Sequence, residues 1–405
     1  MIKPFKALRP RPELAQQLAS RPYDVLNSEE ARVEATGNPY SFLHITKSEI
    51  DLPAKLDIHS RVVYDMAKEN LDRFVSDGIL LREKSSCYYI YQLTMNAKTQ
   101  TGLVCLSSVD DYFNDIIKKH EFTRPEKEKD RIDHMLAIKA QTGNVFLAYR
   151  DVDEMNTIVA KWKTAKKPVY DFTSADGIAH TVWIIDDDEM IRSITDIFQS
   201  KVPSTYIADG HHRAASAAKV SEQMPSNENA KYFLTTIFPA TELKILDYNR
   251  LIKDLDGLSN EEFLNKLEND FTVEKATGAF SPRAPHEFGM YLDRQWYVLR
   301  SKEGTFSTSP VGVLDVTILS ENILNKILGI KDQRTDKRVD FVGGIRGLAE
   351  LEKRVDNGEM KVAFSLHPVT IRQLFDIADS GNTMPPKSTW FEPKLRDGLL
   401  SHMLD

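Results

Sequence analysis

The chain has 405 residues, of which 41% are hydrophobic and 28% are charged, a composition typical of folded globular proteins. Its length predicts two or three domains. The net charge of -7 and the pI near 5.9 give no overall positive surface, so we expect no nucleic-acid binding. Two cysteines, Cys87 and Cys105, are too few for a disulfide framework or a thiolate metal cluster. With no signal peptide or bilayer-spanning apolar run, we expect a cytoplasmic protein.

The N-terminal part of the chain is rich in proline and predicts irregular structure over residues 1–60, with a helical pattern from Ile50 to about Gly78. Residues 87–106 alternate, are rich in aromatic and β-branched side chains and have a turn-like centre, which predicts a β-hairpin. Two helices are expected next, over residues 109–120 and 125–141.

Strand and helix patterns then mix along the rest of the chain, which predicts a mixed α/β (α+β) fold. Strands are expected over 144–150, 167–173, 180–186, 204–208, 232–239 and 243–249, and helices over 154–165, 188–200 and 214–224. After Asn260 we expect a helix, a hairpin over 288–300 and helices over 313–328, 345–358 and 370–381, with strands between them and a polar loop over 383–394. No linker marks the borders, so we place three regions at 1–85, 86–260 and 261–405 from these patterns alone.

The pentad Asp209-Gly210-His211-His212-Arg213 is the strongest candidate for chemistry, because it lies between a buried strand and an alanine-rich helix. A glycine turn at a helix start aims backbone N–H groups at an anion, and the helix dipole adds positive charge. Arg213 can contact phosphate oxygens, and the two histidines can transfer protons. Asp209 can accept a hydroxyl proton or bind Mg²⁺. The structural alternative is that Asp209 caps the helix.

The segment ADGHHRAASAA resembles the strand–turn–helix signature of the ParB/sulfiredoxin superfamily, whose terminal arginine cradles nucleotide phosphates. His211 replaces the sulfiredoxin cysteine, and the Glu-Arg-Arg form of ParB is absent. The pentad therefore looks most like that of the free-serine kinases, whose Asp and His are thought to serve phosphoryl transfer to serine. This resemblance implies a ParB/sulfiredoxin-like core over residues 86–260, with added N-terminal and C-terminal α/β regions.

Nearly the whole chain resembles the bacterial family catalogued as domain of unknown function 1015. The matching stretches are KKHEFTRPEKEKDR, VFLAYRD, YIADGHHRAA, LKILDYNR, RTDKRVDFVGGIRG and MPPKSTWFEPK. Members of this family tend to lie beside serine-biosynthesis genes, which implies serine or phosphoserine as the substrate.

Three further segments carry candidate residues. Glu121 could be a second carboxylate for base or metal work, and Arg124 a phosphate contact, although both suit a solvated helix end. A second strand–glycine–helix unit and a proline-stiffened loop offer phosphate contacts, and their alternatives are a surface charge run and a packed loop. These candidate residues are Gly343, Gly344, Arg346, Lys387, Ser388 and Thr389.

Together these features predict a phosphoryl-transfer enzyme acting on free serine or phosphoserine, first of all a nucleotide-dependent serine kinase. ATP or ADP would be the donor, Mg²⁺ would bridge phosphate oxygens, and Asp209, His211, His212 and Glu121 would form the catalytic set. A phosphoserine phosphatase could use the same anion cradle. A ParB-like nucleotide-binding switch or scaffold would need little chemistry. The sequence does not define the oligomeric state.

Overall fold

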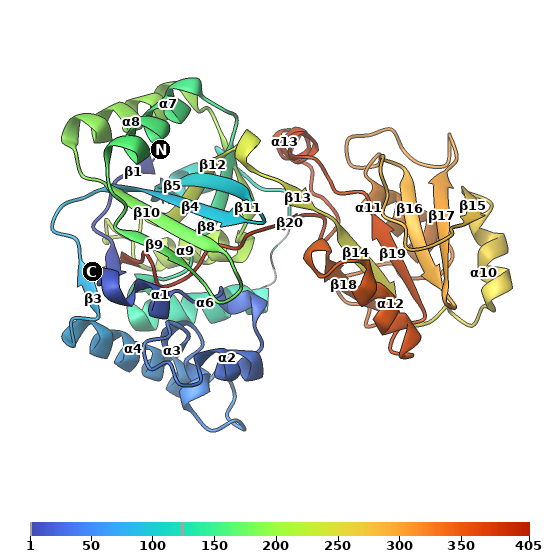
Figure 1. The fold of residues 1–405 in the computed structure, drawn as a ribbon, viewed down its shortest axis with the longest axis horizontal. Coiled ribbons are helices and arrows are strands. Elements are labelled where there is room, and N and C mark those ends of the chain that lie inside the picture. The colour runs from blue at the N-terminus through green and yellow to red at the C-terminus, as the bar shows by residue number, and fades with distance from the viewer. Residues whose placement is uncertain (1, 122, 124) are drawn as a thin grey trace. The chain divides into compact units, whose positions relative to one another are not determined.

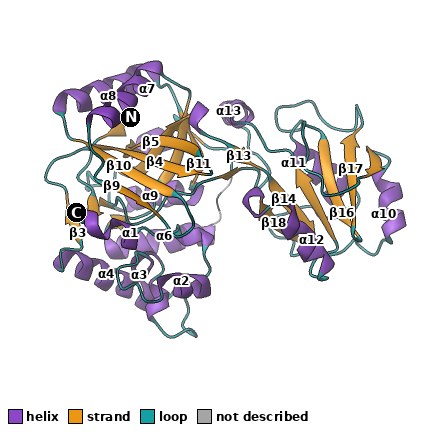
Figure 2. Ribbon diagram, in the orientation of Figure 1, coloured by secondary structure: helices purple, strands orange, loops and turns teal. Residues whose placement is uncertain are grey.

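The computed structural model describes residues 2–121, 123 and 125–405. The chain forms two compact units (Figure 1). The first unit comprises Met1–Lys119, Thr123–Leu243 and Pro393–Asp405, and the second comprises His120–Phe122 and Lys244–Glu392. Each unit combines helices with a sheet, which confirms the mixed α/β fold (Figure 2). The three regions expected from the sequence stay a prediction beside this division.

The first unit is built on a mixed sheet with the order β6-β11-β8-β12-β5-β4-β10-β9, and β1 pairs with β5. The predicted hairpin over 87–106 is confirmed as β4 and β5, and Asn96 and Ala97 at its turn have positive φ, as a tight two-residue turn requires. The strands are β1 (Ile2–Lys3), β4 (Tyr88–Met95), β5 (Lys98–Ser108), β6 (Ile117–Lys118), β8 (Val145–Tyr149), β9 (Tyr170–Thr173), β10 (Ala179–Ile185), β11 (Thr205–Asp209) and β12 (Tyr232–Pro239).

Helices cover both faces of this sheet, with α7 and α8 above it and α6 and α4 below it in Figure 1. Both faces are therefore buried, and strands such as β8 are apolar along their whole length. Helix α9 packs against α6. The main helices are α4 (Arg61–Ser76), α6 (Pro125–Ile138), α7 (Asp153–Ala165), α8 (Asp188–Lys201) and α9 (His211–Gln223).

The N-terminal residues are more regular than the sequence predicted. They contain β2 (Leu8–Pro10), which pairs with β3 (Leu80–Arg82), and the short helices η1 (Pro12–Leu14), α1 (Ala15–Leu18), η2 (Tyr23–Val25), α2 (Ser28–Ala35), α3 (Leu43–Thr46) and η3 (Ser48–Asp51). A capping box between Asn27 and Glu30 starts α2. At the other end of the chain, β21 (His402–Met403) pairs with β7 (Ala140–Gln141), which ties the C-terminus to the first unit.

The predicted helix over 109–120 is wrong beyond its first turns. Helix α5 (Val109–Phe113) ends early because Asp115 takes a positive φ of 57° and the chain then pairs as β6 with β11. The predicted helix over 345–358 is also interrupted, because Gly347 has a φ of 71° between η6 (Gly344–Arg346) and α12 (Leu348–Asp356). In both places a left-handed residue decides the break.

The second unit has a six-stranded antiparallel sheet with the order β15-β17-β16-β19-β14-β18. Its strands are β14 (Tyr248–Ile252), β15 (Phe271–Lys275), β16 (Glu287–Leu292), β17 (Gln295–Ser301), β18 (Val339–Gly343) and β19 (Val362–Leu366). A separate pair joins β13 (Ile245–Leu246) to β20 (Trp390–Phe391). The helices are α10 (Asn260–Leu267), α11 (Asp315–Ile318) continued by η5 (Leu319–Asn325), α12 and α13 (Ile371–Asp379). In neither unit is any described helix both long and apolar enough to cross a membrane.

Candidate functional site

The pentad forms the predicted turn between a strand and a helix in the first unit. Strand β11 ends at Asp209, Gly210 is the N-cap with φ 94° and ψ 29°, and α9 begins at His211. The positive φ favours glycine here, whereas a β-carbon on Gly210 would make an ordinary van der Waals contact, 3.4 Å from Cα of Val145. The first turn of α9 follows directly, and the N–H groups at a helix start form a site suited to an anion.

The carboxylate of Asp209 contacts one backbone N–H group and one lysine ammonium group at this turn. The backbone N–H of Gly210 donates to its Oδ1 at 2.9 Å, and Nζ of Lys394 lies 3.1 Å from its Oδ2. Both side chains are partly buried, with exposed fractions of 33% for Asp209 and 16% for Lys394. Because both side chains remain partly exposed to solvent, a ligand can displace Lys394 from Asp209 and bind to either group.

Lys394 did not stand out in the sequence as a site residue. It lies 185 residues from Asp209, at the end of a loop whose Lys387, Ser388 and Thr389 were the candidates. No local pattern links the two positions. Only the folded C-terminal segment of the first unit brings this lysine to the pentad.

His211 is buried at the first position of α9, with 7% of its surface exposed. Burial lowers the pKa of its imidazole to about 4, and the charge of Asp209 opposes that shift. The ring is therefore neutral at physiological pH and suits hydrogen bonding to a ligand, while its lowered pKa makes it a weak base. His212 is half-buried at the next position of the helix.

Arg213 points into the protein interior, with only 8% of its side chain exposed. Its NH2 group donates to both carboxylate oxygens of Asp24, at 3.0 and 2.9 Å. Its NH1 group donates to the carbonyl of Asn144 at 2.6 Å. These bonds occupy the guanidinium within the first unit, so a phosphate contact from Arg213 would require the pair with Asp24 to open. That contact stays a prediction.

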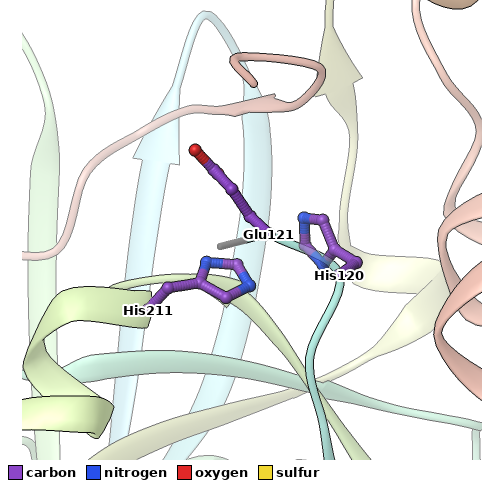
Figure 3. A group of neighbouring side chains, drawn as sticks. All are labelled: His120, Glu121 and His211. Carbon is purple, nitrogen blue, oxygen red and sulfur yellow. The ribbon is translucent and has the colours of Figure 1, made fainter. Parts of the chain in front are cut away.

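The segment with Glu121 follows β6, which pairs in parallel with β11. Segments that follow parallel neighbouring strands leave the sheet at the same edge. Figure 3 shows the three side chains concerned, with His211 at the start of α9 and His120 and Glu121 on the loop after β6. His120 and Glu121 belong to the second unit and His211 to the first, so a metal-ligand role for Glu121 stays a prediction. Arg124 lies outside the described residues.

The remaining candidates lie in the second unit, where three segments meet around Tyr248. The ring of Trp390 is 5.0 Å from that of Tyr248, and Nζ of Lys387 is 5.7 Å from the same ring. A β-carbon on Gly343 would lie 2.7 Å from the ring of Trp390, so close packing requires this glycine. Lys387 is exposed and stays a candidate for phosphate contact.

Four other candidates lie in the second unit, two of them with local structural roles and two of them partly or fully exposed. A β-carbon on Gly344 would collide with the side chain of Asp247, whose backbone carbonyl accepts from the Gly344 N–H at 2.8 Å. Ser388 is buried and donates to the carbonyl of Pro385 at 2.6 Å. Arg346 is exposed in η6 and Thr389 is half-buried. Their phosphate-binding roles stay predictions.

Comparison with known proteins adds a family and distant fold similarities. The family model described as "Protein of unknown function (DUF1015)" matches residues 2–317. No curated protein sequence matches the chain.

Three solved structures illustrate the fold similarity, which is too distant to carry an argument about function. A free serine kinase in complex with AMP has 11% identity and a TM-score of 0.40, covering 75% of this chain and 91% of that one. A conserved hypothetical protein from Pyrococcus furiosus has 14% identity and a TM-score of 0.38, covering 73% and 94%. SbnI with a C-terminal truncation, from Staphylococcus aureus, has 11% identity and a TM-score of 0.38, covering 73% and 85%.

Proposed function

We propose a function for a chain that belongs to the DUF1015 family of proteins of unknown function: phosphoryl transfer on free serine or phosphoserine, first of all as a nucleotide-dependent serine kinase. One observation carries this proposal. At the turn from β11 to α9, a carboxylate, a neutral imidazole and an ammonium group surround a helix N-terminus, in the order Asp209, His211 and Lys394. This arrangement combines an anion site with groups that can move a proton.

In the kinase reaction the serine hydroxyl attacks the terminal phosphorus of ATP or ADP. The new O–P bond forms as the bond to the nucleotide's bridging oxygen breaks, and the nucleotide leaves with that electron pair. Asp209 accepts the hydroxyl proton, with His211 next to it as the alternative acceptor. The N–H groups of the first turn of α9 bind the phosphate oxygens, and Lys394 adds positive charge there.

Asp209 also fits the metal that such a reaction uses, because its carboxylate offers the oxygen ligands that Mg²⁺ prefers. Lys394 would then have to turn from the carboxylate toward the phosphate oxygens, a movement that its partial exposure permits. A bound magnesium ion would neutralise charge on the phosphates. Glu121 belongs to the second unit and stays a separate candidate for a second carboxylate.

The proposal is tested by incubating the full-length protein with Mg²⁺ and serine plus ATP or ADP, and separately with phosphoserine alone, and following the products by phosphorus NMR. Phosphoserine formed from serine supports the kinase. Release of inorganic phosphate from phosphoserine would instead identify the protein as a phosphoserine phosphatase. If nucleotide binds and no product forms in either arm, the protein is a nucleotide-binding switch or scaffold.

Asp209→Asn identifies the residue that carries the chemistry. It keeps the shape and removes the charge, so we expect turnover to fall by about 10²-fold or more while nucleotide binding survives. Asp65→Asn, on the exposed face of α4, is the matched control and should keep full activity. The N-cap of α9 is Gly210 and has no side-chain cap bond, so the expected capping role of Asp209 is wrong. Thermal melts accompany both variants, because Asp209 accepts a hydrogen bond from the Gly210 N–H at the turn. A lower melting temperature with unchanged turnover in Asp209→Asn would assign Asp209 to a structural role at the turn alone.

A further inference from the structure

A second cavity, of about 540 Å³, lies within the first unit among its N-terminal helices. Its walls come from η2, η3, α4 and α6. This volume is within the range of about 300–1,000 Å³ that small-molecule sites occupy. Asp209 and His211 are not among the described residues that line it, so the cavity is distinct from the turn at the start of α9.

The inner end of this cavity adjoins a smaller recess of about 30 Å³. The two spaces adjoin, because they share Tyr23, Arg131 and His134 as lining residues. The recess is lined further by Arg213 and Asp397. Since about 10–15 Å³ of such volume holds one water molecule, the recess has room for a small polar group such as a hydroxyl.

Two buried polar atoms in the recess lack a hydrogen-bond partner among the described residues. They are Nε of Arg213 and Oδ2 of Asp397, whose side chains are 8% and 1% exposed. Burying such atoms without a partner costs free energy, and native proteins pair almost all of them. The recess is therefore built for a polar guest that donates to Asp397 and accepts from Arg213.

Charges of both signs line the larger cavity. Asp130 pairs with Arg131 at 2.6 Å, and Glu49 pairs with Lys47 at 3.1 Å. Asp24 lines the same wall while holding Arg213. A ligand with a single charge would meet a like charge at each of these pairs, whereas a ligand with one positive and one negative group can match them.

We propose that this cavity binds a small zwitterion of the α-amino-acid class, with its carboxylate toward Arg131, which lines both spaces, and its ammonium group toward Glu49 and Asp24. Asp24 also accepts hydrogen bonds from Arg213, which lies on the first turn of α9. A ligand bound to Asp24 therefore competes with Arg213 and affects the start of this helix, next to the candidate site. The choice of serine and phosphoserine as first probes rests on the proposed function. The assignment of the cavity as a binding site is independent of that function.

Calorimetric titration of the full-length protein with L-serine and phosphoserine tests this site, with ethanolamine and 3-hydroxypropanoate as probes that carry only one of the two charges. We expect saturable binding of an amino acid and at least tenfold weaker binding of both single-charge probes. A titration with the remaining standard amino acids follows if serine and phosphoserine fail. If none of them binds, the recess holds water only and the proposal is overturned.

Variants place the binding in this cavity. Glu49→Gln should weaken binding of the amino acid at least tenfold. Glu29→Gln, on the exposed surface of α2, should leave this affinity unchanged. If Glu49→Gln does not fold, His59→Ala replaces it, because His59 lines the cavity and its side chain is 59% exposed. Asp209→Asn should keep this binding whether or not the protein turns over serine. Binding lost in Asp209→Asn but kept in Glu49→Gln would move the ligand to the turn and overturn the proposal.

Discussion

Arg213→Ala distinguishes a guanidinium that stabilises the fold from one that binds phosphate. The side chain makes two charge-assisted hydrogen bonds to Asp24 and one to the carbonyl of Asn144, and it is 8% exposed. Removing one partner of a buried ion pair costs about 3–5 kcal/mol. Asp24 keeps 33% of its side chain exposed, and solvent can therefore compensate it in part, so we expect the lower end, about 3 kcal/mol.

The magnitude converts directly into a melting temperature. For a unit of this size about 1 kcal/mol shifts the midpoint by roughly 2–4 °C, so about 3 kcal/mol predicts a fall of roughly 6–12 °C. Calorimetric melts measure it, and Asp24→Asn is the comparison, with a fall of at least similar size because it leaves the Arg213 guanidinium, which is 8% exposed, without its charged partner. Nucleotide affinity is measured on the same samples. A melt within about 1 °C of the wild type together with lost nucleotide binding would refute this reasoning and restore Arg213 as a phosphate ligand.

Two further changes test the turn and the buried histidines. Gly210→Ala forces a side chain into a left-handed backbone with φ 94°, so we expect a loss of about 1–2 kcal/mol in urea unfolding, and an unchanged midpoint would contradict the turn geometry. His134 is buried, and burial lowers its pKa to about 4. Its unfolded form binds a proton below about pH 6.5, so stability falls as pH drops from about 6.5 to 4, by about 3 kcal/mol for this residue. His134→Gln should reduce this dependence of stability on pH. An unchanged pH dependence would mean that other groups control it.

The sequence could predict the local geometry of the candidate site because that geometry depends on neighbouring residues. A strand, a glycine and a helix follow one another within a few positions, and only a left-handed Gly210 can join them. The hairpin formed by β4 and β5 was predictable for the same reason. Its alternating pattern and its turn lie within one continuous segment.

The partners of the pentad could not be predicted, because they come from distant parts of the chain. Asp24 lies 189 residues before Arg213 in an N-terminal segment that showed no periodicity, and Lys394 lies 185 residues after Asp209. The glycines of the second unit illustrate a different ambiguity. Gly343 matches an anion-binding pattern in sequence, whereas in the structure it makes room for the ring of Trp390. Close packing and phosphate binding both select glycine, so a single sequence does not separate them.

The two ends of the pentad therefore have different environments. Asp209 shares its carboxylate with Lys394 at a partly exposed turn, while Arg213 is engaged with Asp24 in the interior. If Arg213 keeps that pair, an incoming phosphate must obtain its compensating charge from the helix N-terminus and from Lys394. In the proposed reaction Lys394 would then supply the positive charge that the sequence pattern assigned to Arg213. The cavity behind Arg213 adds a consequence: a ligand that competes for Asp24 would free the guanidinium and thereby alter the turn on which the reaction depends.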